Sequence, residues 1–128
     1  MTSRQSELER VLSELAEELP DPQWVALVDD QGLVLSCVPE NPVIDEERVS
    51  AMSAAVVGMG ERVMEEVEGG QLRFANVVGS KRQYLMVVLT NDRLLSIGLS
   101  PQIAAQATFR PLSHWVPELL QTLERRIG

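Results

Sequence analysis

The first forty residues show two hydrophobic patterns, one typical of a helix and one typical of strands. Within residues 3–19 the apolar positions recur at the spacing of an amphipathic helix. Pro20 follows and ends that helix. Residues 23–38 consist of two short apolar runs around a polar turn, in which Gly32 can adopt a positive φ. The pattern therefore predicts a helix followed by a β-hairpin.

A second helix is predicted from Asp45 to about Glu68. Asp45 is a favourable N-cap residue, and Gly69 and Gly70 provide a C-terminal stop. Valines and methionines recur along this segment at helical spacing, and we expect that stripe to pack on the sheet. The stripe consists of Val49, Met52, Val56, Met59, Val63 and Val67.

The other side of the second helix has few polar residues, although it should meet water. Between residues 50 and 60 only Ser50 and Ser53 are polar, and a glycine inside a helix costs about 1 kcal/mol relative to alanine. The remaining residues of this side are small or apolar: Ala51, Ala54, Ala55, Val57 and Gly58. Either the chain itself covers the helix on most sides, or a second copy packs there with Gly58 at the closest approach. Two-fold homodimers are the commonest oligomers. We favour the second copy, because the ends of the helix, Asp45 to Arg48 and Glu61 to Glu68, are polar and indicate a contact centred on its middle.

Three strands are predicted next, over residues 71–78, 83–89 and 94–99. Short turns join them, which indicates an antiparallel meander. The first of these strands can lie at a sheet edge, and it has no proline that would protect such an edge. Pairing with its own copy across a two-fold axis would cover it.

The last segment is predicted to be helical. A helical turn over residues 102–108 should end at Pro111, and a final helix over residues 113–127 should begin at Ser113 with Pro117 in its first turn. The element order is then α-β-β-α-β-β-β-α. It predicts an α+β domain in which helices flank a five-stranded antiparallel sheet.

Length and charge narrow the class of protein. The chain has 128 residues and a net charge of −8, so one domain over residues 1–128 is expected. The negative charge argues against nucleic acid and against anionic membrane surfaces as partners. No apolar run approaches the roughly 20 residues of a membrane span. We therefore expect a cytoplasmic protein.

Residues for catalysis or metal binding are not apparent. Cys37 is the only cysteine and lies in an apolar run, so a structural role is expected. Cys37 and His114 cannot supply the roughly four ligands of a structural zinc site. Residues 58–62, GMGER, lack the lysine and the strand-loop-helix context of a phosphate-binding loop. We expect no catalytic residues, no metal and no cofactor.

Three segments in this order resemble the Roadblock/LC7 domain, most closely its free-standing prokaryotic branch. They are the hairpin WVALVDDQGLVLS, the helix SAMSAAVVGMGERVMEEV and the run LRFANVVGSKRQYLMVVLTNDRLLSIGLSP. The resemblance covers about residues 5–100 and implies a profilin-like fold that dimerises through the second helix and the third strand. The interface residues that it implies are Ala51, Ala54, Ala55, Gly58, Arg62, Arg73, Ala75 and Val77.

The resemblance also implies a function. Roadblock domains are partners of small Ras-like GTPases or light chains of dynein, and the GTPase role applies in bacteria and archaea. Some members accelerate GTP hydrolysis by arranging the GTPase's own residues, and others only scaffold. The expected function is therefore a homodimeric regulator or scaffold of a small Ras-like GTPase that is not itself an enzyme. The alternative is a small-molecule-sensing or signalling adaptor domain of profilin-like fold, which needs an internal pocket with polar groups.

Overall fold

Five strands form one antiparallel sheet in the computed structural model, which describes residues 3–124. The strand order is β2-β1-β5-β4-β3, so β2 and β3 are the edge strands. The elements are α1 (Arg4–Glu18), β1 (Pro22–Asp29), β2 (Val34–Val38), α2 (Glu46–Glu66), β3 (Phe74–Val78), β4 (Gln83–Thr90), β5 (Arg93–Leu99), η1 (Ala105–Thr108) and α3 (Phe109–Glu124). The predicted α+β class with a five-stranded antiparallel sheet is confirmed.

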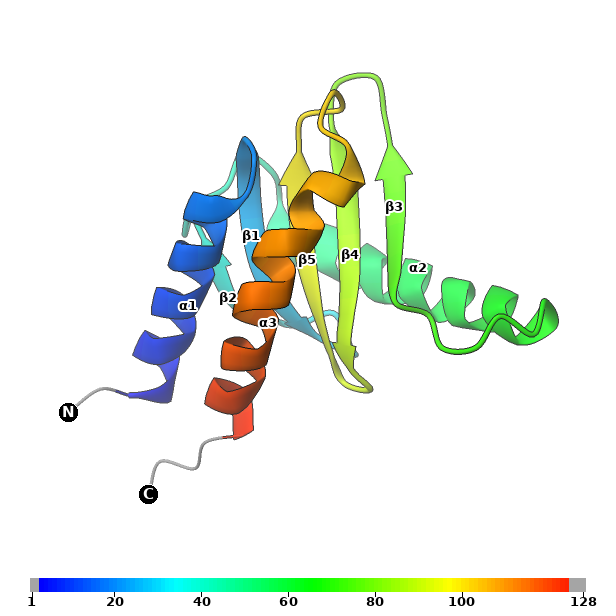
Figure 1. Cartoon of the computed structure of the whole chain (residues 1–128), viewed down its shortest axis with the longest axis horizontal. Helices are drawn as coiled ribbons and strands as arrows, with labels where there is room; N and C mark the ends of the chain where they lie inside the picture. The colour runs from blue at the N-terminus through cyan, green and yellow to red at the C-terminus, as the bar shows by residue number, and fades with distance from the viewer. Residues whose placement is uncertain (1–2, 125–128) are drawn as a thin grey trace.

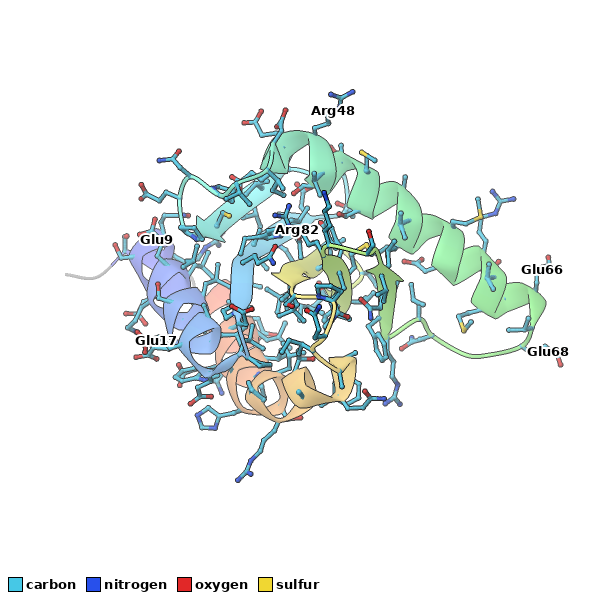
Figure 2. All side chains as sticks on the ribbon, turned by 90° about the horizontal axis from the view of Figure 1, so that it is seen from above. Glu9, Glu17, Arg48, Glu66, Glu68 and Arg82 are labelled. Atoms are coloured by element: carbon cyan, nitrogen blue, oxygen red, sulfur yellow. The ribbon has the colours of Figure 1, made fainter. Side chains whose placement is uncertain are left out.

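Helices cover both faces of the sheet. Figure 2 shows α1 and α3 on one side of the sheet and α2 on the other. The larger core lies on the side of α1 and α3, where Leu12 of α1 and Leu119 of α3 are fully buried with the side chains of the strands. A smaller cluster lies on the α2 side and includes Trp24, Val57 and Met86.

The first two helices begin and end as their sequences predict. The Ser3 side chain accepts a hydrogen bond from the Ser6 amide at 3.1 Å, and Asp45 caps α2 in the same way. At the end of α2, the Gly69 amide donates to the Met64 carbonyl at 2.8 Å. The chain from there to Arg73 is not a strand, so the third strand is shorter than predicted.

The last helix begins earlier than predicted. α3 starts at Phe109, directly after η1, so Pro111 lies in its first turn and does not end the helical segment. The first turn tolerates proline because its amides have no partner within the helix. Ser113 is therefore not the N-cap, and Pro117 lies in the helix interior. The predicted end at residues 125–127 lies outside the described residues.

The stripe of α2 that was expected on the sheet faces away from it. Met52 and Met59 are 61% and 59% exposed, and the other exposed members of the stripe are Val56, Val63 and Val67. Ser50, Ser53 and Val57 are the residues of α2 that are buried. The assignment of the two sides of this helix from the sequence is wrong, and Val57 belongs to the sheet side.

Hydrogen bonds explain why Ser53 can be buried there. The Ser53 hydroxyl donates to the Val49 carbonyl at 2.8 Å and shares a hydrogen bond with the Tyr84 hydroxyl. Tyr84 is also bonded to Ser96 at 2.5 Å, and the indole N–H of Trp24 donates to Ser96 at 3.1 Å. Burying a hydroxyl costs little when its hydrogen bonds are made inside the protein.

Gly98 offers a test of the packing under α2. A β carbon at this residue would overlap the buried ring of Trp24, which its hydrogen bond to Ser96 holds in place. We expect Gly98→Ala to lower the free energy of unfolding by about 1–3 kcal/mol, the usual cost of overpacking. Urea denaturation measures the change. Stability equal to that of wild type would show that the Trp24 ring can move aside.

Candidate functional site

The two edges of the sheet differ in protection. On β2, the Gln5 side chain donates to the Leu35 carbonyl at 3.1 Å, and Pro39, which has no amide N–H, follows the strand directly. On β3, the described residues contain no further strand, and Figure 1 shows the edge without a neighbour in the sheet. Unpaired edges are sites for pairing with another chain. β3 is therefore the open edge of the sheet.

The pairing of β3 with β4 shows which backbone groups are free. The Val88 amide donates to the Arg73 carbonyl and the Gly79 amide to the Arg82 carbonyl, each at 2.9 Å. Hydrogen-bonded pairs alternate along an antiparallel ladder, and the register between these two pairs has no shift. The odd-numbered residues of β3 therefore bond to β4. The other residues direct both backbone groups to the free edge: Phe74, Asn76 and Val78.

Apolar side chains are exposed on both faces of this edge. On the α3 face, Phe74 packs on Phe109 with the ring centroids 5.6 Å apart, and Val78 is 61% exposed. On the α2 face, Val77 is 54% exposed, while Ala75 is half-buried against the small cluster under α2. Such an edge carries none of the charges or prolines that prevent pairing.

The exposed face of α2 adjoins this edge. Figure 1 shows that α2 crosses the sheet and that its C-terminal part extends past β3. Six of the eight predicted interface residues are exposed, and Ala54 and Ala75 are half-buried. The exposed six are Ala51, Ala55, Gly58, Arg62, Arg73 and Val77. The structure therefore brings the predicted helix and strand residues to one side of the molecule.

The two glycines of α2 have different surroundings. A β carbon at residue 60 would lie 2.9 Å from the Leu72 side chain, so Gly60 makes room for the segment that leads to β3. A β carbon at Gly58 would meet nothing within 4 Å. Packing among the described residues therefore gives no reason for Gly58, despite its cost to the helix.

The exposed apolar surface is larger than the set of residues named from the sequence. The sequence interpretation did not assign Phe74 or Val78 to the interface, and it placed the exposed stripe of α2 on the sheet. The alternation in FANVV, residues 74–78, could have shown that both faces of the strand are apolar.

Within residues 3–124, no group of three or more metal-binding side chains was found. His114 is exposed beside the Trp115 ring, and the Arg82 guanidinium lies 5.4 Å from the centre of the Trp24 ring. Burial raises the pKa of the Tyr84 hydroxyl, although its hydrogen bonds to serines oppose this.

A groove of about 730 Å³ adjoins the β3 edge on the side of α3. Leu85, Val87 and Leu112 are among its apolar lining residues, and Phe74 of the free edge lines it as well. Glu61 and Glu65 supply most of the charge around it. The groove belongs to the same surface as the open edge, and its uncharged polar lining residues are Gln71, Thr90, Asn91 and Ser113.

Comparison with known proteins identifies the family. The family model "Roadblock/LC7 domain" matches residues 8–97, which is more than half of the chain. The chain therefore belongs to the Roadblock/LC7 domain family, a family that generally consists of non-catalytic regulators. No match was found among curated protein sequences. Among the described helices, none is long and apolar enough to cross a membrane.

Solved structures share the fold at low sequence identity. The Roadblock/LC7 domain from Streptomyces avermitilis superposes with a TM-score of 0.80 at 15% identity and covers 91% of this chain and 98% of its own. Myxococcus xanthus MglB gives a TM-score of 0.82 at 14% identity, with 100% of this chain and 98% of its own covered. The gliding protein MglB from Thermus thermophilus gives 0.82 at 12%, with 97% and 93% covered. The predicted fold is thus that of Roadblock/LC7 and MglB structures.

The rate at which the Cys37 thiol reacts with a disulfide reagent tests whether this residue has a structural role. Burial raises its pKa above the ordinary value, and the neighbouring Glu46 carboxylate raises it further. A raised pKa lowers the thiolate fraction near pH 8, so we expect a disulfide reagent to react at least about tenfold more slowly than with the chain in urea. Glu46→Gln removes the carboxylate and should increase the rate modestly. Equal rates in the folded and unfolded chain would contradict the structural role.

Proposed function

We propose that the chain is a homodimeric regulator or scaffold of a small Ras-like GTPase and that it dimerises through α2 and β3. The main support for the dimer is that an open strand edge and an exposed apolar helix face lie on the same side of the molecule. Membership in the Roadblock/LC7 family and the likeness to MglB structures support the GTPase as the partner. A second copy covers the edge and the helix together.

The proposed contact consists of a helix part and a strand part. On α2, the small residues allow a close approach and the exposed stripe beside them supplies the apolar area. Methionine suits such a surface because its side chain adapts to irregular partners. On β3, free backbone groups supply directional hydrogen bonds. The predicted interface residues are the core of this contact: Ala51, Ala54, Ala55, Gly58, Arg62, Arg73, Ala75 and Val77.

The proposed dimer acts on the GTPase by positioning the GTPase's own residues. Arg82 lies over Trp24, and Arg93 is paired with Asp92 at 3.2 Å. Arg62 and Arg73 lie within the proposed dimer contact. We propose that the dimer arranges the GTPase's own residues or scaffolds it.

Gly58 tests the dimer directly. We expect wild-type protein at micromolar concentration to show twice the 14.2 kDa of one chain in size-exclusion chromatography with light scattering. Gly58→Leu fills the proposed closest approach and should shift the protein to 14.2 kDa, with urea stability of the monomer unchanged within about 1 kcal/mol.

Glu17→Leu is the matched control, because Glu17 is exposed on α1 on the other side of the sheet (Figure 2). It adds the same side chain and should leave the dimer intact. A wild-type protein that runs as a monomer, or a Gly58→Leu variant that stays dimeric, would contradict the proposal.

The GTPase partner is tested by capture. Purified chain is immobilised and offered the small Ras-like GTPases of the same genome, each loaded with GDP or with a non-hydrolysable GTP analogue. We expect one GTPase to bind in its GTP form, with binding reduced at least about tenfold by Gly58→Leu because the dimer presents the docking surface. GTP turnover with and without the chain separates stimulation from scaffolding. Absence of binding in both nucleotide states would contradict the GTPase role.

A further inference from the structure

We infer that the groove beside β3 is a docking site for a basic, amphipathic helix of a partner protein. The groove is formed by residues of one chain, so this site needs neither the proposed dimer nor the GTPase role. Three features support it: an apolar floor that the sheet leaves uncovered, a set of exposed polar residues, and two glutamates one helical turn apart.

The groove exists because β3 is shorter than the strand beside it. β3 begins at Phe74, which pairs with Val87, whereas β4 continues to Thr90. Among the described residues, no strand residue therefore lies beside Leu89 on that side of β4. The β4 side chains that face α3 form the floor: Leu85 is fully buried, while Val87 and Leu89 are half-buried. The floor is apolar and has no strand above its open end.

Residues of α3 and β3 form one wall of the groove. Phe109, Leu112 and Ser113 line it from α3, at the i, i+3 and i+4 spacing of a single helix face. The rings of Phe74 and Phe109 are each 40% exposed. Aromatic side chains are enriched in protein–protein contacts, so these rings are suitable anchors for a partner's apolar side chains.

The uncharged polar residues of the groove remain in contact with water. All of them are exposed, whereas Leu85 and Leu112 are buried. A buried apolar centre together with exposed polar groups is the arrangement of a protein–protein contact. These polar residues are Gln71, Thr90, Asn91 and Ser113.

Two carboxylates determine the charge of the groove. Glu61 and Glu65 lie four residues apart on α2, so they share one side of the helix and are about 6 Å apart along its axis. Both are exposed, and neither forms an ion pair with a described residue. Arg73 is the one basic residue among the described lining residues, and Glu66 and Glu68 add negative charge at the same end of α2 (Figure 2). The groove therefore favours cationic side chains.

An amphipathic helix with basic residues fits this combination. Its apolar face covers the floor, as in other complexes where a helix lies in an apolar groove. Lysines or arginines four residues apart on the partner helix are also one turn apart, so they can pair with both glutamates at once. The net charge of −8 attracts a basic segment over a longer range. Because exposed ion pairs contribute little, the floor supplies most of the affinity and the glutamates orient the helix.

Binding of designed peptides tests this site. Two labelled peptides of about 18 residues, long enough to form a helix, carry leucines at positions i, i+3, i+4 and i+7. The lysine peptide has two lysines four residues apart beside the leucines, and the glutamate peptide has glutamates at the same two positions. We expect wild-type protein to bind the lysine peptide at least about tenfold more tightly in fluorescence anisotropy, because the glutamate peptide sets like charges against the groove.

Charge reversal on α2 provides the matched variant. Glu61→Lys/Glu65→Lys should prefer the glutamate peptide at least about tenfold, because the groove is then basic. Glu9→Lys/Glu17→Lys changes the net charge by the same amount on exposed residues of α1, away from the groove (Figure 2), and should keep the wild-type preference. A reversed preference cannot arise from misfolding, which would remove binding of both peptides.

An NMR titration locates the bound peptide. The lysine peptide should shift the methyl signals of Leu85, Val87 and Leu112, which line the groove, and leave those of Leu35 on β2 unchanged. Equal affinity of wild-type protein for the two peptides, or shifts confined to residues outside the groove, would overturn the inference.

Two other occupants of the groove give different results. If a second copy fills it, the groove methyl signals shift with protein concentration in the absence of peptide, and Gly58→Leu abolishes that shift. If the groove binds small apolar molecules instead, a neutral apolar dye occupies it and excess lysine peptide does not displace the dye. Either result overturns the inference. Wild-type protein that is monomeric and binds the lysine peptide in the groove supports the inference and contradicts only the proposed dimer.

Discussion

The buried chain of hydroxyl groups under α2 determines which side of this helix meets the sheet. Ser53, Tyr84 and Ser96 satisfy one another there, with the Trp24 indole as a further donor. Because these hydrogen bonds are closed within the protein, a polar side of the helix is buried and the valines and methionines face outward. An apolar helix face beside an open strand edge is therefore a consequence of polar packing underneath it.

This arrangement concentrates the apolar exposed surface on one side of the molecule. α1 and α3 cover the other face of the sheet, and their outer residues are mostly charged or polar. The proposed dimer combines two kinds of contact: directional backbone pairing along β3 and adaptable side-chain contact on α2. The first fixes geometry, and the second adds apolar area that water would otherwise cover.

The fold could be predicted from the sequence because caps, turns and strand runs are local signals. Ser3, Asp45 and Gly32 act in the structure as their residue types suggest. The orientation of α2 could not be predicted, because helical spacing gives a stripe but does not say whether serines opposite it will find partners. The start of α3 was misplaced since Pro111 was taken as a break, although a first turn accepts it. Local patterns identified the elements, and tertiary hydrogen bonds decided their faces.

The β2 edge is partly blocked, and this limits how many chains can be joined in one continuous sheet. Gln5 occupies the Leu35 carbonyl, and Pro39 stops the strand, so this end of the sheet offers little for another strand to extend. Where two copies join through β3, both outer ends of the combined sheet are β2. Assembly by strand addition then stops at two chains, and the same contact that builds the pair cannot propagate into a fibre.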